Sequence, residues 1–275
     1  MICKEFSPVF ILTPYIKSYI IIEDSEGTIT NKQMSIYPSG HLEMIISYGD
    51  DVSLFSNDIH LMKKAGGYLG GQILKPVYYK CFGKMRIISV IFNPYGFYRF
   101  LKIPQIEFTH KKVDLDLIFK KDSNIFIDML CEAESYDEKV NILNDLFCEL
   151  LKKNTPDSIT TYRAAKIIKK CTGNIKIKEL SGLLNKNIKT IERDFNKIIG
   201  LTPKEFSRVI RFNKAFNSIS SGEYCNIHDV VYDFGYYDQA HLINEFKEFT
   251  GLSPSDFIKK ENNDIEYSFR EKVQI

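Results

Sequence analysis

Two groups of hydrogen-bonding side chains recur at the same place in a repeated segment of the chain. Their members are Lys189, Glu192, Arg193 and Asn196 in the first copy, and Gln239, His241 and Asn244 in the second. Arginine and lysine donate to guanine O6 and N7, asparagine and glutamine pair with adenine, and glutamate accepts from cytosine N4. These side-chain types suit contacts to the edges of DNA bases.

The repeat that carries these groups spans residues 177–206 and 227–257. Matching pairs are offset by 50 before the turn and by 51 after it: Leu180/Val230, Leu184/Phe234, Asn187/Asp238, Ile191/Leu242, Phe195/Phe246 and Gly200/Gly251. The second copy therefore has one extra residue in its turn. Each copy predicts an apolar-faced helix, a turn residue that tolerates positive φ (Asn185 or Gly235), and a second helix with an N-cap side chain. This pattern predicts two helix-turn-helix units.

A helical pattern over residues 203–220 separates the two units and would span roughly 27 Å at the usual rise per residue. That length can hold two recognition helices about one DNA turn, near 34 Å, apart. Residues 157–260 carry 17 Lys and Arg against 12 Asp and Glu, whereas residues 1–156 carry 18 against 19. The basic excess lies with the repeat, as a surface that faces phosphates requires.

Residues of about 159–260 resemble the C-terminal DNA-binding domain of AraC/XylS-type transcriptional regulators. The second copy carries Phe234-Gly235-Tyr236, Asp238-Gln239, Phe246-Lys247 and Ser253-Pro254, and the first carries Thr190-Ile191-Glu192-Arg193 and Thr202-Pro203. The resemblance implies seven helices, with the two recognition helices in successive major grooves. The residues that we expect at DNA are Asn187, Lys189, Thr190, Glu192, Arg193, Asn196, Lys197, Gln239, His241 and Asn244. Asn244 stands where the family commonly has arginine, so we expect looser reading by the second unit.

The first half of the chain has a different pattern. Short β-branched or aromatic runs at residues 19–22, 42–48, 72–79 and 86–92 are separated by turn signals such as Gly66-Gly67 and Gly70-Gly71, which predicts a small barrel or sandwich. Helical patterns follow from Pro94, and the apolar stripe within 136–151 suits either the core or a dimer seam. We therefore expect an α+β chain: a β-rich domain with helices (1–153), an all-α domain with two helix-turn-helix units (157–260), and a polar tail (261–275).

This half also resembles, more weakly, a domain of unknown function that precedes AraC-type domains in many bacterial regulators. The similar residues are Pro14-Tyr15, Pro38, Gly40-His41, Glu43 and Phe92-Asn93-Pro94-Tyr95-Gly96. The resemblance implies a small-molecule sensor or a dimerisation domain. The ligand-binding residues that we predict are Tyr37, His41, Glu43, Tyr78 and Phe92. For His41 and Glu43 a hydrogen-bonded turn pair is the competing interpretation. Clustered His-x-His ligands are lacking, so we expect no metal and no cofactor.

Several other classes of protein are disfavoured. The six cysteines lie far apart, which favours reduced thiols in a cytoplasmic protein over a disulfide framework or a zinc and methyl-acceptor cluster. No apolar run approaches the ~20 residues of a membrane span, and no G-x-S-x-G motif indicates a hydrolase. We expect no catalytic residues and no enzyme activity.

We expect a one-component, sequence-specific transcriptional activator controlled by a small molecule, with double-stranded DNA and RNA polymerase as partners and a homodimer as its assembly. The alternative is a ligand-independent DNA-binding regulator whose N-terminal half only dimerises.

Overall fold

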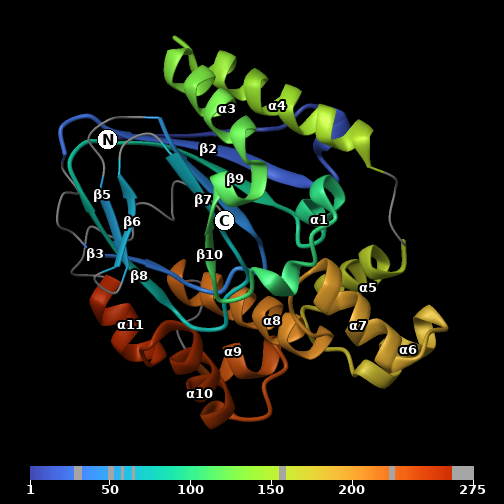
Figure 1. Ribbon diagram of the computed structural model, residues 1–275. Coiled ribbons are helices and arrows are strands. Elements are labelled where there is room, and N and C mark those ends of the chain that lie inside the picture. The colour runs from blue at the N-terminus through green and yellow to red at the C-terminus, as the bar shows by residue number, and fades with distance from the viewer. Residues whose placement is uncertain are drawn as a thin grey trace.

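The computed structural model describes residues 1–27, 33–48, 53–56, 59–63, 66–154, 159–222 and 227–261. A β-rich first half lies against an all-helical second half (Figure 1), so the predicted α+β class is confirmed. Between the two predicted domains, residues 155–156 fall outside the described residues, as does all of the polar tail except Glu261. The domain boundaries therefore stay predictions.

The described strands of the first half form two antiparallel sheets. The larger has the order β1 (Ile2–Phe6), β2 (Ile16–Asp24), β9 (Met85–Phe92), β4 (Glu43–Ser47), β7 (Gly66–Gly70) and β10 (Lys112–Asp114). The smaller has the order β3 (Gln33–Ile36), β8 (Val77–Phe82), β5 (Ser53–Ser56) and β6 (Ile59–Lys63). The chain thus builds the sandwich alternative of the predicted β-domain.

The larger sheet is covered on both faces. In β2, Ile20 and Ile22 belong to the apolar cluster shared with β3 and β8, whereas Tyr19 and Ile21 belong to the cluster shared with the helices. Burial on both faces explains why β2 and β9 contain nearly continuous apolar runs.

Where the structure describes the first half, four helices complete it: α1 (Gly96–Leu101), α2 (Leu115–Phe119), α3 (Lys121–Glu132) and α4 (Tyr136–Lys153). Two single turns of 3-10 helix, η1 (Phe10–Leu12) and η2 (Gln105–Glu107), lie in the connections. On α4 the predicted apolar stripe places Val140, Leu143 and Phe147 in the core. This burial favours the core interpretation of the stripe over the dimer seam.

One predicted strand was misplaced. The strand expected over 72–79 begins only at Val77, and the segment 66–70, expected as a turn from its glycines, forms β7 instead. A Cβ on Gly67 would lie 2.6 Å from the Ile45 carbonyl oxygen and 2.6 Å from Leu115 Cδ1. Glycine here allows a close approach between neighbouring strands and a helix rather than a turn.

The described residues of the second half form seven helices, as predicted: α5 (Ile159–Lys170), α6 (Ile177–Leu184), α7 (Ile188–Ile198), α8 (Pro203–Ser220), α9 (Ile227–Asp233), α10 (Gln239–Thr250) and α11 (Pro254–Glu261). Helix α8 lies among the others (Figure 1) and begins with a capping box between Thr202 and Glu205. No helix in the described ranges is long and apolar enough to cross a membrane.

Two glycines of the first unit offer a matched test of the fold. Gly200 has a φ of 85°, and a Cβ there would lie 2.8 Å from Thr109 Oγ1 and 2.9 Å from the Gln105 carbonyl oxygen. We expect Gly200→Ala to lower the free energy of unfolding by at least about 1–2 kcal/mol, the cost of a left-handed residue with a Cβ. Urea denaturation measures the change.

Gly182→Ala is the control. This glycine lies inside α6, and a Cβ there meets nothing within 4 Å. The substitution should raise stability by about 0.5–1 kcal/mol because glycine is a poor helix former. Equal effects of the two substitutions would contradict this account of Gly200.

Candidate nucleic-acid interface

The turn of the first unit has the predicted geometry. Asn185 ends α6 in the left-handed region with a φ of 49°, and the Lys186 amide donates to the Ser181 carbonyl at 3.2 Å. The Asn187 side chain then caps α7 by accepting from the Lys189 amide at 2.8 Å. Asparagine thus serves at both positions: Asn185 adopts the left-handed conformation that ends α6, and the Asn187 side chain caps α7.

The second unit repeats this turn with different residues. Gly235 has a φ of 68°, and the Tyr236 amide donates to the Val231 carbonyl at 3.0 Å, exactly 50 positions after the equivalent bond of the first unit. Asp238 caps α10 by accepting from the His241 amide at 2.7 Å. The two units share one backbone design.

The extra residue of the second copy lies in the turn, just before the N-cap of its recognition helix. One residue separates Asn185 from its cap, whereas Tyr236 and Tyr237 separate Gly235 from Asp238. Tyr236 is buried with its ring 4.8 Å from the Arg211 guanidinium, whereas Tyr237 is 91% exposed. The added residue thus places an aromatic side chain on the outside, next to the N-terminus of α10.

The inner faces of both recognition helices are buried as predicted. Ile191 and Phe195 of α7, like Leu242 and Phe246 of α10, are at most 3% exposed. The Phe195 ring lies 6.0 Å from that of Phe206 on α8. The polar residues between them are therefore turned away from the core.

Most predicted DNA-contact residues lie on this outer face. Asn187, Lys189, Glu192, Arg193, Gln239 and Asn244 are exposed, and Thr190, Asn196 and His241 are partly exposed. The Arg193 guanidinium donates to Asp194 at 3.1 and 3.2 Å while its side chain stays 74% exposed. Asp194, which sequence reasoning did not single out, orients Arg193.

His241 has a defined hydrogen-bonding role. Its Nδ1 lies 3.3 Å from the Tyr237 amide, which can only donate, so Nδ1 accepts and the neutral ring carries its proton on Nε2. The ring also packs edge-on against Tyr236 at 5.2 Å. Nε2–H is then a donor suited to an acceptor on a base edge or to a phosphate oxygen.

Lys197 is placed differently from the other candidates. Its ammonium lies 5.6 Å from the centre of the Tyr98 ring, in the first half of the chain. The side chain therefore faces the N-terminal domain across the domain boundary. Its contact with DNA stays a prediction.

A buried ion-pair cluster fastens α10 to α8. The Glu245 side chain is only 2% exposed and accepts from Arg208 Nε at 2.9 Å and from Arg211 at 2.9–3.2 Å. Sequence reasoning missed this cluster. The available signal was the spacing of Arg208 and Arg211, which places both on one face of a helix. Because buried charges need partners, Glu245 constrains the position of the second recognition helix, α10, on α8.

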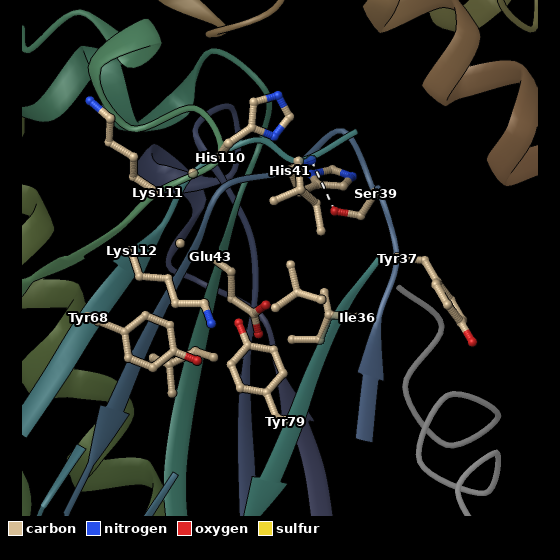
Figure 2. Close-up of a pocket in the computed structure, with 15 residues that line it drawn as sticks. Ile36, Tyr37, Ser39, His41, Glu43, Tyr68, Tyr79, His110, Lys111 and Lys112 are labelled. Carbon is tan, nitrogen blue, oxygen red and sulfur yellow. Dashed lines mark hydrogen bonds between the residues drawn. The ribbon is translucent and has the colours of Figure 1, made fainter. Parts of the chain in front are cut away.

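The N-terminal domain contains a small cavity between its two sheets, lined by apolar as well as polar side chains (Figure 2). The cavity, of about 70 Å³, is lined by three predicted ligand residues, Tyr37, His41 and Glu43. Phe92 is instead fully buried in the core, and Tyr78 is not among the lining residues. Tyr79 also lines the cavity, and further lining residues that sequence reasoning missed are Tyr68, Lys111, Lys112 and His110.

The electrostatics of the cavity are mixed. His41 Nδ1 lies 2.7 Å from the Phe92 carbonyl oxygen and so donates to it, while burial, together with Lys169 and Lys17, lowers the His41 pKa to about 3. Glu43 accepts from the Ser89 hydroxyl. Burial lowers the pKa of Lys112, whose ammonium lies 4.0 Å from the centre of the Tyr79 ring, to about 8. The cavity thus offers both hydrogen-bond donors and acceptors. No group of three metal-ligating side chains occurs among the described residues.

Two families match the chain. Residues 180–260 match a helix-turn-helix domain, and residues 4–114 match a domain of unknown function. The chain carries an AraC-type helix-turn-helix domain at its C-terminus. This match bears out the resemblance found in the sequence and supports a DNA-binding transcription regulator.

Solved structures give more distant likenesses to the chain. ToxT from Vibrio cholerae is 14% identical over 90% of this chain and 98% of its own, with a TM-score of 0.49. ToxT with a bound unsaturated fatty acid is 12% identical over 87% and 94%, with a TM-score of 0.48. The AraC-like transcriptional activator CuxR is 10% identical over 89% and 71%, with a TM-score of 0.20. At this distance the likenesses assign no ligand to the chain. No curated protein matches it in sequence.

Removing Glu245 tests the attachment of the second recognition helix. Glu245→Ala leaves Arg208 and Arg211 without their buried partner, and breaking such a pair costs about 3–5 kcal/mol of unfolding free energy. Glu248, 43% exposed and paired with Arg208, is the control, and its removal should cost at most about 1 kcal/mol. Urea denaturation of both variants measures their loss of unfolding free energy. Equal losses would show that Glu245 has no special role.

Proposed function

We propose that the chain is a one-component, sequence-specific transcriptional regulator that activates its target through the AraC-type domain. The observation that carries the proposal is the duplicated unit: two capped recognition helices with buried apolar faces and exposed polar faces, joined by α8. Double-stranded DNA is the partner that this arrangement suits, since each helix can enter a major groove.

We propose that the two units read DNA unequally. The first unit presents Lys189 and Arg193, both exposed long cations, whereas the second presents Gln239, His241 and Asn244. Arginine pairing with guanine is the strongest common form of base recognition, so the first unit contributes most of the specificity. The expected DNA site is correspondingly asymmetric.

We also propose that the cavity in the N-terminal domain receives a small effector. The support is its position: Ser39 and His41 line it on either side of Gly40, which packs on α8, and His110 lines it directly after Thr109, which donates to Gly200. An occupant would touch the segments that hold the AraC-type domain. It would change DNA binding only if it binds two arrangements with different affinity.

A second candidate function is a ligand-independent regulator whose first half only dimerises. Its support is the small size of the cavity, about 70 Å³, which limits an effector to a few heavy atoms. For both candidate functions we also propose that the protein contacts RNA polymerase, forms a homodimer and acts in the cytoplasm.

DNA footprinting at several salt concentrations tests the main proposal. We expect a protected asymmetric site of roughly 20 bp whose affinity falls steeply with salt, because bound phosphates release counterions. Arg193→Ala should cost about 1–3 kcal/mol of binding free energy and relax the preference at one base position.

Lys84→Ala is the charge-matched control, since Lys84 is exposed between β8 and β9 in the first half of the chain. It should leave the base preference unchanged. A protein that binds random DNA sequences as well as selected ones would exclude the regulator.

A thermal-shift screen separates the two candidate functions. An effector at 100 times its Kd should add about 2.7 kcal/mol of stability. Gly70→Val should abolish that shift, because Gly70 lines the cavity and a Cβ there meets only Glu43 O at 3.6 Å and Tyr68 Cε2 at 4.0 Å, which leaves room for the substitution.

Gly66→Val, on the same face of β7 but outside the cavity, is the control and should keep the shift. A compound that stabilises both variants equally binds elsewhere. If no compound in a broad metabolite library stabilises the protein, the ligand-independent regulator is favoured.

A further inference from the structure

The N-terminal domain touches both helix-turn-helix units at the same position of the repeat. Gly200 and Gly251 are equivalent residues, each of which follows a recognition helix with a positive φ, 85° and 80°. The Thr109 hydroxyl donates to the Gly200 carbonyl oxygen at 2.6 Å. A Cβ on Gly251 would lie 2.7 Å from the Tyr78 hydroxyl, which donates to the Thr250 carbonyl at 3.4 Å.

The N-terminal domain also contacts α8, the helix that joins the two units. Gly40 packs against the first half of α8, where a Cβ would lie 3.4–3.6 Å from Phe206, Val209 and Ile210. The Tyr37 ring, 7% exposed, lies 5.5 Å from that of Phe216, near the end of α8, and 6.1 Å from that of Phe257 on α11. One domain thus braces the first unit, the spacer and the second unit together, as their arrangement in Figure 1 also shows.

We propose that the N-terminal domain sets the separation and relative rotation of the two recognition helices, and thereby the spacing between the two half-sites that the chain accepts on DNA. Thr109 and Tyr78 are the positioning residues. This inference rests on the proposed DNA reading by both units.

The placement of the brace makes its role separable from DNA contact. Thr109 meets the chain at Gly200, beyond the C-terminal end of α7, whereas the exposed cations Lys189 and Arg193 lie in the first half of that helix. A substitution in the brace therefore leaves the DNA-facing side chains unchanged. It alters only how firmly one unit is held relative to the other.

The test uses the full chain with Thr109→Val and Tyr78→Phe combined, which removes the two contacting hydroxyls. Binding is measured to a set of DNA sites in which base pairs are added or removed between the half-sites. The wild type should show one preferred spacing. In the double variant the loss of affinity at other spacings should shrink by roughly 2- to 10-fold for each hydrogen bond removed, with the preferred spacing little affected.

The control variant combines Thr13→Val and Tyr136→Phe. These hydroxyls donate to Phe10 and Glu23 within the N-terminal domain, so the control loses the same atoms and should keep the wild-type spacing profile. If the double variant has the same spacing profile as the wild type, the proposal that the N-terminal domain sets the half-site spacing is wrong. Failure of the wild type to select any sequence overturns the DNA-reading proposal instead.

A second measurement does not depend on DNA. Spin labels placed at Leu183 on α6 and Tyr232 on α9, 58% and 87% exposed, report the distance between the units. The distance distribution should be narrow in the wild type and control, and broader in the double variant. Identical distributions in all three proteins would also overturn the brace.

Discussion

The burial of α8 on several sides is the constraint on which the second half of the molecule depends. Phe206, Phe212 and Phe216 are at most 2% exposed, and the rings of Phe212 and Phe216 meet α10 while that of Phe206 meets α7. A helix that is apolar on so many sides must be surrounded. It therefore collects the first unit, the second unit and the N-terminal domain around one core, which makes the two recognition helices parts of one body.

The two copies of the helix-turn-helix unit keep their scaffold and differ where they meet solvent. Asn185 and Gly235 solve the same need for a left-handed residue, and Asn187 and Asp238 the same need for a cap. The differences lie outside, where the second unit gains the exposed Tyr237. Because the scaffold carries folding and the exposed face carries recognition, the copies could diverge in what they bind without losing their shape.

The N-terminal cavity and the domain contacts are built from the same short segments. Burial, with Lys169 and Lys17 nearby, lowers the pKa of His41 and keeps its ring neutral, and its neighbour Gly40 packs on α8. A change in the cavity is thus one residue away from a change at the domain boundary. Because the same segments line the cavity and contact α8, this arrangement favours a sensor over a passive dimerisation domain. Coupling between the cavity and the second half of the chain needs no long series of intermediate contacts.

The sequence by itself determined the seven helices of the second half, their caps and turns, and the polar residues on the outer faces, because helical periodicity and capping are local. It misplaced the strand expected over 72–79, since the role of Gly67 depends on Ile45 and Leu115, which are distant in the chain. Only the tertiary structure decided the pairing of Glu245 with α8, the turning of Lys197 toward Tyr98, and the burial of Phe92. Each depends on which elements meet, and long-range packing leaves no periodic signal.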